Sequence, residues 1–364
     1  MNNLNKRWIT CYAILFYGII MIASCKEQED QLLPINDLSS MPYNSLSEYG
    51  LFTGTLNELI PVDETLPYDL NVPLFSDYAQ KSRFIYLPPN QKIKYNKDEI
   101  IDFPTGTIIV KTFYFLADIN DQNSEKRIIE TRLLVKYENE WLAWDYVWNE
   151  AQTEATYTIT SKVVNVNWLH YDGSMVSTNY VIPNQNECKT CHSVDSVMIP
   201  IGPKGRNMDL IKTYSDGTTM NQLDKIAEKN WWTSDGYNKD GDFPNWQDNI
   251  ADVDKKARAY LDINCAHCHN PHANANNSGL FLHYTNTDSS SLGICKPPVA
   301  AGGGTGGFQY AIVPGHPESS IMVNRLNSLE PDVMMPEIGR SQLHQEGIEL
   351  IRNWILGLPE SNCN

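Results

Sequence analysis

The chain has little positive charge. Its 364 residues include 28 lysines and arginines against 44 aspartates and glutamates, which gives a formal net charge of −16. A surface of this sign repels the phosphate backbone of nucleic acids, so we expect no nucleic-acid partner. It suits a redox partner protein with a basic docking surface, and we expect a partner of that kind.

Long hydrophobic runs are lacking except near the N-terminus. Residues 8–21 form an apolar segment that follows Lys6 and Arg7 and precedes small residues and Cys25. The pattern predicts a lipoprotein signal peptide at 1–24, with Cys25 lipidated as the mature N-terminus; an uncleaved signal anchor is the alternative. We therefore expect an extracytoplasmic protein that is lipid-anchored to a bacterial membrane. The expected membrane is the outer membrane, and the protein would lie on its periplasmic or its surface face.

Cysteine is also scarce, yet four of the eight cysteines lie in two copies of one pattern, Cys-x-x-Cys-His, at 188–192 and 265–269. Chance placement gives only roughly 0.004 copies per chain. Two thiols at this spacing can add to the vinyl groups of one haem, and the next histidine then lies under the iron as the proximal ligand. The sequence therefore predicts two covalent c-type haems, held by Cys188, Cys191, Cys265 and Cys268, with His192 and His269 as iron ligands.

Other uses of these cysteines are less favoured. Zinc ribbons space their Cys-x-x-Cys pairs by roughly 15–20 residues, whereas 77 positions separate Cys188 from Cys265. A thioredoxin-like redox pair does not require a histidine after the second cysteine. Zinc and structural disulfides stay open as alternatives. Of the other cysteines, Cys295 and Cys363 are candidates for a disulfide, although spacing alone does not show that they meet.

The chain divides into parts of different character. Residues 25–60 are polar and predict a tether with a short helix near 46–51. Residues 61–183 contain short β-branched and aromatic runs separated by turn residues, which predict an antiparallel β-sandwich-like domain. Residues 184–248 form the first haem-binding segment and a linker. Residues 249–364 predict a mainly α-helical, cytochrome c-like domain with the second haem, containing a helix at 252–264 and a last helix capped by Ser341. The fold class is α+β, multidomain.

A histidine-bound haem iron has one further axial position, and methionine there raises the reduction potential. Met335 precedes Pro336 and the last predicted helix, where a small cytochrome c presents its distal sulfur, so we predict it as the sixth ligand of the second haem. For the first haem we predict Met198, only six residues after His192. Met208 and His170 are the alternatives.

Several phrases of the sequence resemble a family of bacterial diheme c-type cytochromes of unassigned role, across nearly all of the chain after residue 25. These phrases are VPLFSDY at 72–78, FPTGT at 103–107, VKTF at 110–113, ETRLLV at 130–135, YVWN at 146–149, NCAHCHNP at 264–271 and CKPPVAAG at 295–302. The resemblance implies two covalent haems and no established substrate. The strand with Gly106, Thr107 and Lys111, together with a haem motif after a sheet, is more weakly similar to P460-type cytochromes.

The expected function is electron transfer between a donor and an acceptor through two haems, as an electron carrier more than as an enzyme. The alternatives are a haem enzyme, either a peroxidase or a P460-like oxidase, with an open coordination position on the first haem, or a β domain that acts as a docking or substrate-binding module.

Overall fold

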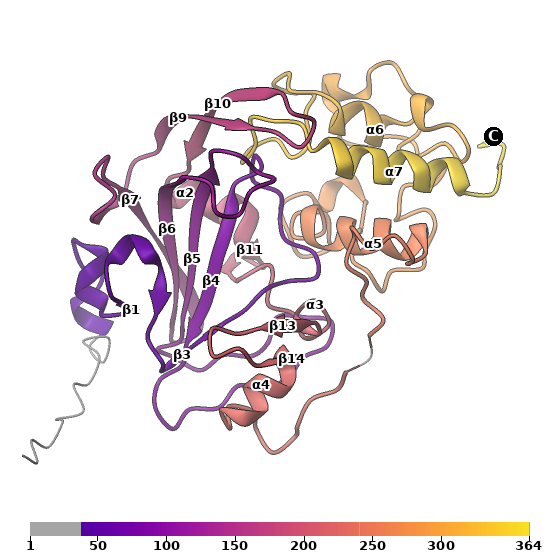
Figure 1. Ribbon diagram of the computed structural model, residues 1–364. Coiled ribbons are helices and arrows are strands. Elements are labelled where there is room, and N and C mark those ends of the chain that lie inside the picture. The colour runs from indigo at the N-terminus through magenta and orange to yellow at the C-terminus, as the bar shows by residue number, and fades with distance from the viewer. Residues whose placement is uncertain (1–37, 240, 364) are drawn as a thin grey trace, which may run out of the picture.

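The computed structural model describes residues 38–239 and 241–363. Its centre is a six-stranded antiparallel sheet in which sequential strands are neighbours, as Figure 1 shows. The strands are β3 (Thr65–Pro67), β4 (Gln80–Tyr86), β5 (Ile108–Leu116), β6 (Lys126–Tyr137), β7 (Glu140–Trp148) and β8 (Ala155–Thr158). The prediction of an antiparallel β-rich region is confirmed, because alternating apolar residues on these strands give the sheet two buried faces.

The segment before the sheet covers one of its faces. It contains η2 (Leu38–Ser40), η3 (Leu46–Tyr49), β1 (Phe52–Thr53), η4 (Leu56–Glu58) and β2 (Ile60–Pro61). Leu46, Tyr49 and Leu51 are fully buried against strand residues such as Tyr146, and the hydroxyl groups of Tyr49 and Tyr146 lie 2.8 Å apart. The prediction of a tether is therefore wrong for residues 38–60, because their few apolar side chains are core residues.

The opposite face of the sheet is covered by two different groups of elements. One is the hairpin of β9 (Lys162–Leu169) and β10 (Met175–Ile182), which packs Trp168 and Tyr180 against Phe113 and Phe115. The other consists of α2 (Gln185–His192), β11 (Ser193–Val194), β12 (Val197–Met198), α3 (Gly205–Met208), β13 (Ile211–Thr213), β14 (Thr219–Asn221) and α4 (Gln222–Glu228). The predicted sandwich is thus incomplete: a hairpin and short helices, not a second full sheet, form the second layer.

The C-terminal part lies beside the sheet (Figure 1). Its α-helices are α5 (Val253–Asn264), α6 (Ile321–Leu326) and α7 (Gln345–Gly357), and its short 3-10 turns are η5 (Asn276–Ser278), η6 (Gly302–Thr305) and η7 (Pro317–Ser319). Long irregular segments separate the helices, and the mainly helical, cytochrome c-like domain that the sequence predicts is not evident. A disulfide joins Cys295 to Cys363, whose Cα atoms are 4.9 Å apart, and confirms that predicted pairing.

The last helix differs from its predicted start. Ser341 does not cap it; its backbone N–H donates to the carboxylate of Asp77 at 2.8 Å, and α7 begins four residues later. This contact ties the C-terminal part to the loop before β4. In the described residues, no helix is both long and apolar enough to cross a membrane.

A buried ion cluster forms a second tie between the two parts. Asp262, near the end of α5, is 1 % exposed and lies 3.1 Å from both Lys204 Nζ and Arg206 Nη2. Burial alone would raise the pKa of Asp262, but Lys204 and Arg206 outweigh burial and lower it. The charged carboxylate therefore holds the end of α5 against the segment that follows the first Cys-x-x-Cys-His motif.

Candidate cofactor sites

The second Cys-x-x-Cys-His motif begins where α5 ends. The side chain of Asn264, the last helical residue, accepts a hydrogen bond from the backbone N–H of Phe75 at 2.8 Å. The carbonyl of Cys265 then accepts hydrogen bonds from the N–H groups of Cys268 at 3.1 Å and His269 at 2.9 Å. One tight turn thus holds both thiols and the histidine together.

A cavity of about 390 Å³ lies beside this turn. Its volume is within the range of roughly 300–1,000 Å³ that is typical of small-molecule and cofactor sites. Cys265, Cys268, His269 and Met335 all line it. The structure therefore brings together, in one cavity, every residue that the sequence predicts for the second haem.

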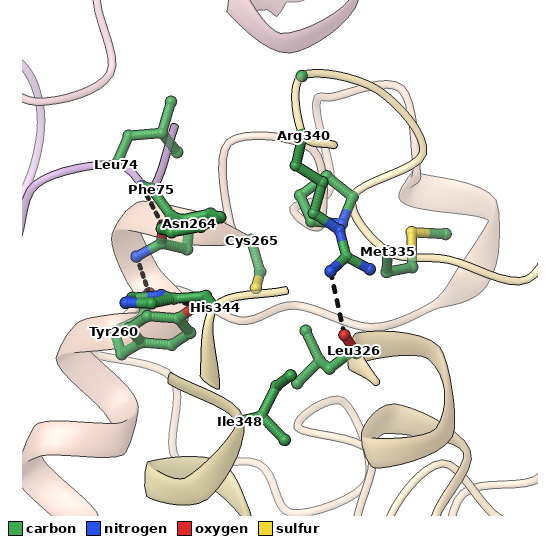
Figure 2. A pocket seen from close by; sticks show the side chains of 12 residues that line it. Leu74, Phe75, Tyr260, Asn264, Cys265, Leu326, Met335, Arg340, His344 and Ile348 are labelled. Carbon is green, nitrogen blue, oxygen red and sulfur yellow. Dashed lines mark hydrogen bonds between the residues drawn. The ribbon is translucent and has the colours of Figure 1, made fainter. Parts of the chain in front are cut away.

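A smaller adjoining cavity shares Cys265 and Met335 with the larger one. Figure 2 shows Cys265 in its middle, with Phe75 and His344 on one side and Arg340 and Met335 on the other. The rings of Phe75 and His344 stack with centroids 4.2 Å apart. Cys265 is therefore accessible from both cavities within a largely apolar wall.

The ring of His269 is held by Ser278. The hydroxyl of Ser278 donates to the carbonyl of Ala275 at 2.6 Å, so its oxygen accepts from Nδ1–H of His269 at 3.1 Å. This hydrogen bond leaves Nε2 of His269 as the unprotonated nitrogen, which is the form that binds a metal.

The first motif occupies the last turns of α2, and its histidine is oriented in the same way. Nδ1 of His192 lies 2.7 Å from the carbonyl oxygen of Ile199 and donates to it, which leaves Nε2 free to act as a ligand. Cys188 is buried against the central sheet, with its Sγ 3.9 Å from Oδ2 of Asp145. In both motifs, Nδ1 of the histidine thus has a hydrogen-bond partner, and Nε2 is left as the possible ligand.

The protonation states fit this arrangement. Burial lowers the pKa of His192 to about 3 and that of His269 to about 4, so both imidazoles are neutral near pH 7. Burial raises the pKa of the Cys188 and Cys265 thiols to about 12. None of the four motif cysteines is in a disulfide. All four are thiols, as thioether formation requires.

The two motifs touch each other. Ligand atoms of Cys191, His267 and Cys268 all lie within 4.8 Å of one another. The hydrogen bond between the side chains of Cys191 and Cys268 lowers the pKa of Cys191 and raises that of Cys268. The carbonyl of Thr190 accepts from Asn274 Nδ2 at 2.8 Å, which fixes the two loops side by side. The sequence carries no signal of this contact, because the motifs are far apart along the chain.

Two of the predicted ligand candidates of the first haem, Met198 and Met208, lie in the apolar cluster of Cys188, whereas His170 lies elsewhere. Met198 pairs with Ser193 in the hairpin of β11 and β12, and its side chain is buried in the apolar cluster that contains Cys188 and Met208. His170 follows β9; its Nδ1 accepts a hydrogen bond from the indole N–H of Trp168 at 3.2 Å, and its ring lies edge-on to that of Tyr78. A ligand role for any of these residues remains a prediction.

The described residues do not complete a structural zinc site. In the described residues, the only cluster of metal-ligand atoms of this kind is Cys191, His267 and Cys268. Structural zinc sites almost always use four ligands, and this cluster has three and excludes Cys188, Cys265, His192 and His269. A haem at each motif uses all of those residues.

The comparisons with known proteins decide nothing further. No family model, no curated protein and no solved structure matches this chain. The case for its function therefore rests on the geometry of the two motifs.

Proposed function

We propose that the chain is a diheme c-type cytochrome that transfers electrons. Cys188 and Cys191 would hold one haem with His192 below its iron, and Cys265 and Cys268 would hold the other with His269. When bound, the two groups supply one-electron redox centres. The contact of Cys191 with Cys268, within 4.8 Å, carries the proposal, because it makes the two attachment points neighbours in space.

The remaining residues have supporting roles in this proposal. Ile199 and Ser278 fix the tautomer and orientation of the two histidines. Met335 supplies a soft thioether sulfur in the cavity of the second motif. The central sheet excludes water from Cys188, which is 8 % exposed.

The setting of the protein is part of the same proposal. Covalent haem attachment takes place outside the bacterial cytoplasm, which agrees with an extracytoplasmic lipoprotein anchored through Cys25; that residue lies outside the described part of the chain. The net charge of −16 favours a redox partner with a basic docking surface.

The proposal is tested by removing one haem at a time. We expect Cys188→Ala/Cys191→Ala and Cys265→Ala/Cys268→Ala each to halve the covalent haem content. In the oxidised wild-type protein, the two ferric centres should perturb each other's electron paramagnetic resonance signals, because their attachment sites are in contact. A wild-type spectrum equal to the sum of the spectra of the two single-haem variants would contradict this account.

A haem enzyme is the second candidate, and the position of Met198 favours it. If Met198 keeps its buried place in the cluster of Cys188 and Met208, a haem held at the first motif would have no second iron ligand from this hairpin. An open iron would bind carbon monoxide in the reduced protein, in an amount equal to half of the haem. Absence of this binding would exclude the enzyme and leave electron transfer.

A further inference from the structure

Four cationic side chains lie on the face of the central sheet that carries α2. The strand register places Arg83 of β4 opposite Lys111 of β5, Lys111 opposite Arg132 of β6, and Arg132 opposite Asp145 of β7. Directly paired residues point to the same face, so these side chains form one row across four strands. Lys81, two residues before Arg83, extends the same face.

Only one of the four cations, Arg132, lies within ion-pair distance of a carboxylate in the described residues. Arg132 donates two hydrogen bonds to Glu130, at 2.6 and 2.8 Å, and lies 3.4 Å from Asp145. Glu130 is fully buried and also accepts from the hydroxyl of Tyr180 at 2.6 Å. Arg132 is thus held and neutralised by two acids and does not need a further partner.

Lys81, Arg83 and Lys111 have no such compensation. In residues 38–239 and 241–363, none of them has a carboxylate within 4.0 Å. Lys81 donates to the carbonyl of Leu74 at 2.9 Å, and Lys111 lies over the ring of Phe113 at 4.6 Å. Arg83 is 8 % exposed, and its one side-chain hydrogen bond is a 3.5 Å contact with the carbonyl of Lys81.

This arrangement is costly without a counter-charge. Burial lowers the pKa of Lys81, Arg83 and Lys111, and repulsion by neighbouring cations lowers those of the two lysines further. The more distant carboxylates of Asp77, Asp69 and Glu130 oppose these shifts only in part. Charges in a protein interior are normally paired, so three neighbouring cations without a carboxylate in direct contact are candidates for an anionic ligand. An anion between the three side chains would remove the repulsion and stabilise their charged forms.

The row begins at the first Cys-x-x-Cys-His motif. Asp145, at one end, lies 3.9 Å from the sulfur of Cys188. With strands about 4.8 Å apart, Arg83 lies roughly 14 Å along the sheet from Asp145. Arg83 is thus set back from the thiols along the sheet, at the other end of the row.

We propose that Lys81, Arg83 and Lys111 form a binding site for a carboxylate or a similar small oxyanion beside the first motif. Two sources supply this chemistry: the propionates of a haem held by Cys188 and Cys191, in which case the inference rests on the proposed function, or a free small anion. Lysine and arginine side chains that converge on one group bind such anions through charged hydrogen bonds.

The test is a calorimetric titration of the full-length, purified protein with formate. The variants are Lys111→Gln and Arg83→Gln, each made in the wild type and in the Cys188→Ala/Cys191→Ala protein. The matched control is Lys126→Gln, because Lys126 lies on the same sheet but packs over Tyr114 on the opposite face. Haem content and thermal unfolding are measured for every protein, so that a folding defect or a failure of haem attachment is seen separately.

The two sources give different results. If the ligand is a free anion, the wild type binds formate, and either substitution weakens binding by about tenfold to a hundredfold. If the ligand is a haem propionate, the wild type does not bind formate, the Cys188→Ala/Cys191→Ala protein does, and Lys111→Gln removes that binding. Lys126→Gln changes neither result.

The proposal is wrong if no protein of the series binds formate. It is also wrong if formate binds but Lys111→Gln and Arg83→Gln bind it as tightly as Lys126→Gln. A wild type that carries no haem at all would refute the proposed function instead, and formate binding to that protein would still test the cationic site.

Discussion

Replacing Met335 by alanine should lower the reduction potential of the second haem by on the order of 0.2 V. Axial ligands set haem potentials over a span of about 0.8 V, and a methionine sulfur favours the ferrous state. Met335 lines both cavities beside Cys265, and its backbone N–H donates to the carbonyl of Arg325 at 3.0 Å, which fixes its position. The potential is measured by spectroelectrochemical titration, and the methionine–iron charge-transfer absorption of the ferric protein should vanish.

Met334 provides the matched control for this experiment. It is adjacent in sequence and similarly half-buried, but it does not line either cavity. Met334→Ala should therefore leave the potential and the charge-transfer absorption unchanged. If instead Met334→Ala causes the loss and Met335→Ala does not, the ligand assignment is wrong.

Replacing Asp262 by alanine should lower the free energy of unfolding by about 3–5 kcal/mol near pH 7, because removing one partner of a buried ion pair leaves an uncompensated buried charge. Here Lys204 loses its carboxylate at 3.1 Å, and Arg206 loses one of two, since Asp98 also pairs with it at 2.5 Å. Chemical denaturation of the purified proteins measures the difference. Glu228→Ala is the control, since Glu228 is 53 % exposed in its pair with Lys225 and should change stability by less than about 1 kcal/mol.

The stabilisation that Asp262 provides should be lost toward low pH. Its folded-state pKa is lowered, so the unfolded chain binds the proton more readily. The stabilisation is therefore complete above the ordinary aspartate pKa of about 3.9 and is lost as the pH falls through the lower folded value. The difference between wild type and Asp262→Ala should shrink in acid; a difference that grows below pH 4 would exclude this linkage.

Local sequence signals predicted the elements that carry the second motif. The apolar spacing at 253–261 predicted a helix over 252–264, and α5 runs from Val253 to Asn264. The carboxylate of Asp252 accepts from two backbone N–H groups at its start. The disulfide could also be predicted from the sequence, because Cys295 and Cys363 are the two cysteines outside the haem motifs, the predicted signal peptide and the predicted lipidation site. In these cases a few neighbouring residues decide the structure.

Features that depend on distant pairing were not predictable in this way. Leu46 and Tyr49 are scattered apolar residues in a polar stretch, and only the sheet face that they cover makes them core. Lys111 and Arg132 each look like a single charge on a strand; the register of β5 and β6 brings them together. The contact of Cys191 with Cys268 likewise requires the whole fold.

The most direct test of the central claim is to count the haems that stay attached to the denatured, purified protein. Mass spectrometry of the intact chain, combined with a haem absorbance assay, gives this number. The account predicts two covalent haems per chain, one lost with Cys188 and Cys191 and the other with Cys265 and Cys268. A protein that is matured in a host competent for c-type haem attachment and still carries no covalent haem, or that carries zinc at Cys191 and Cys268, would contradict it.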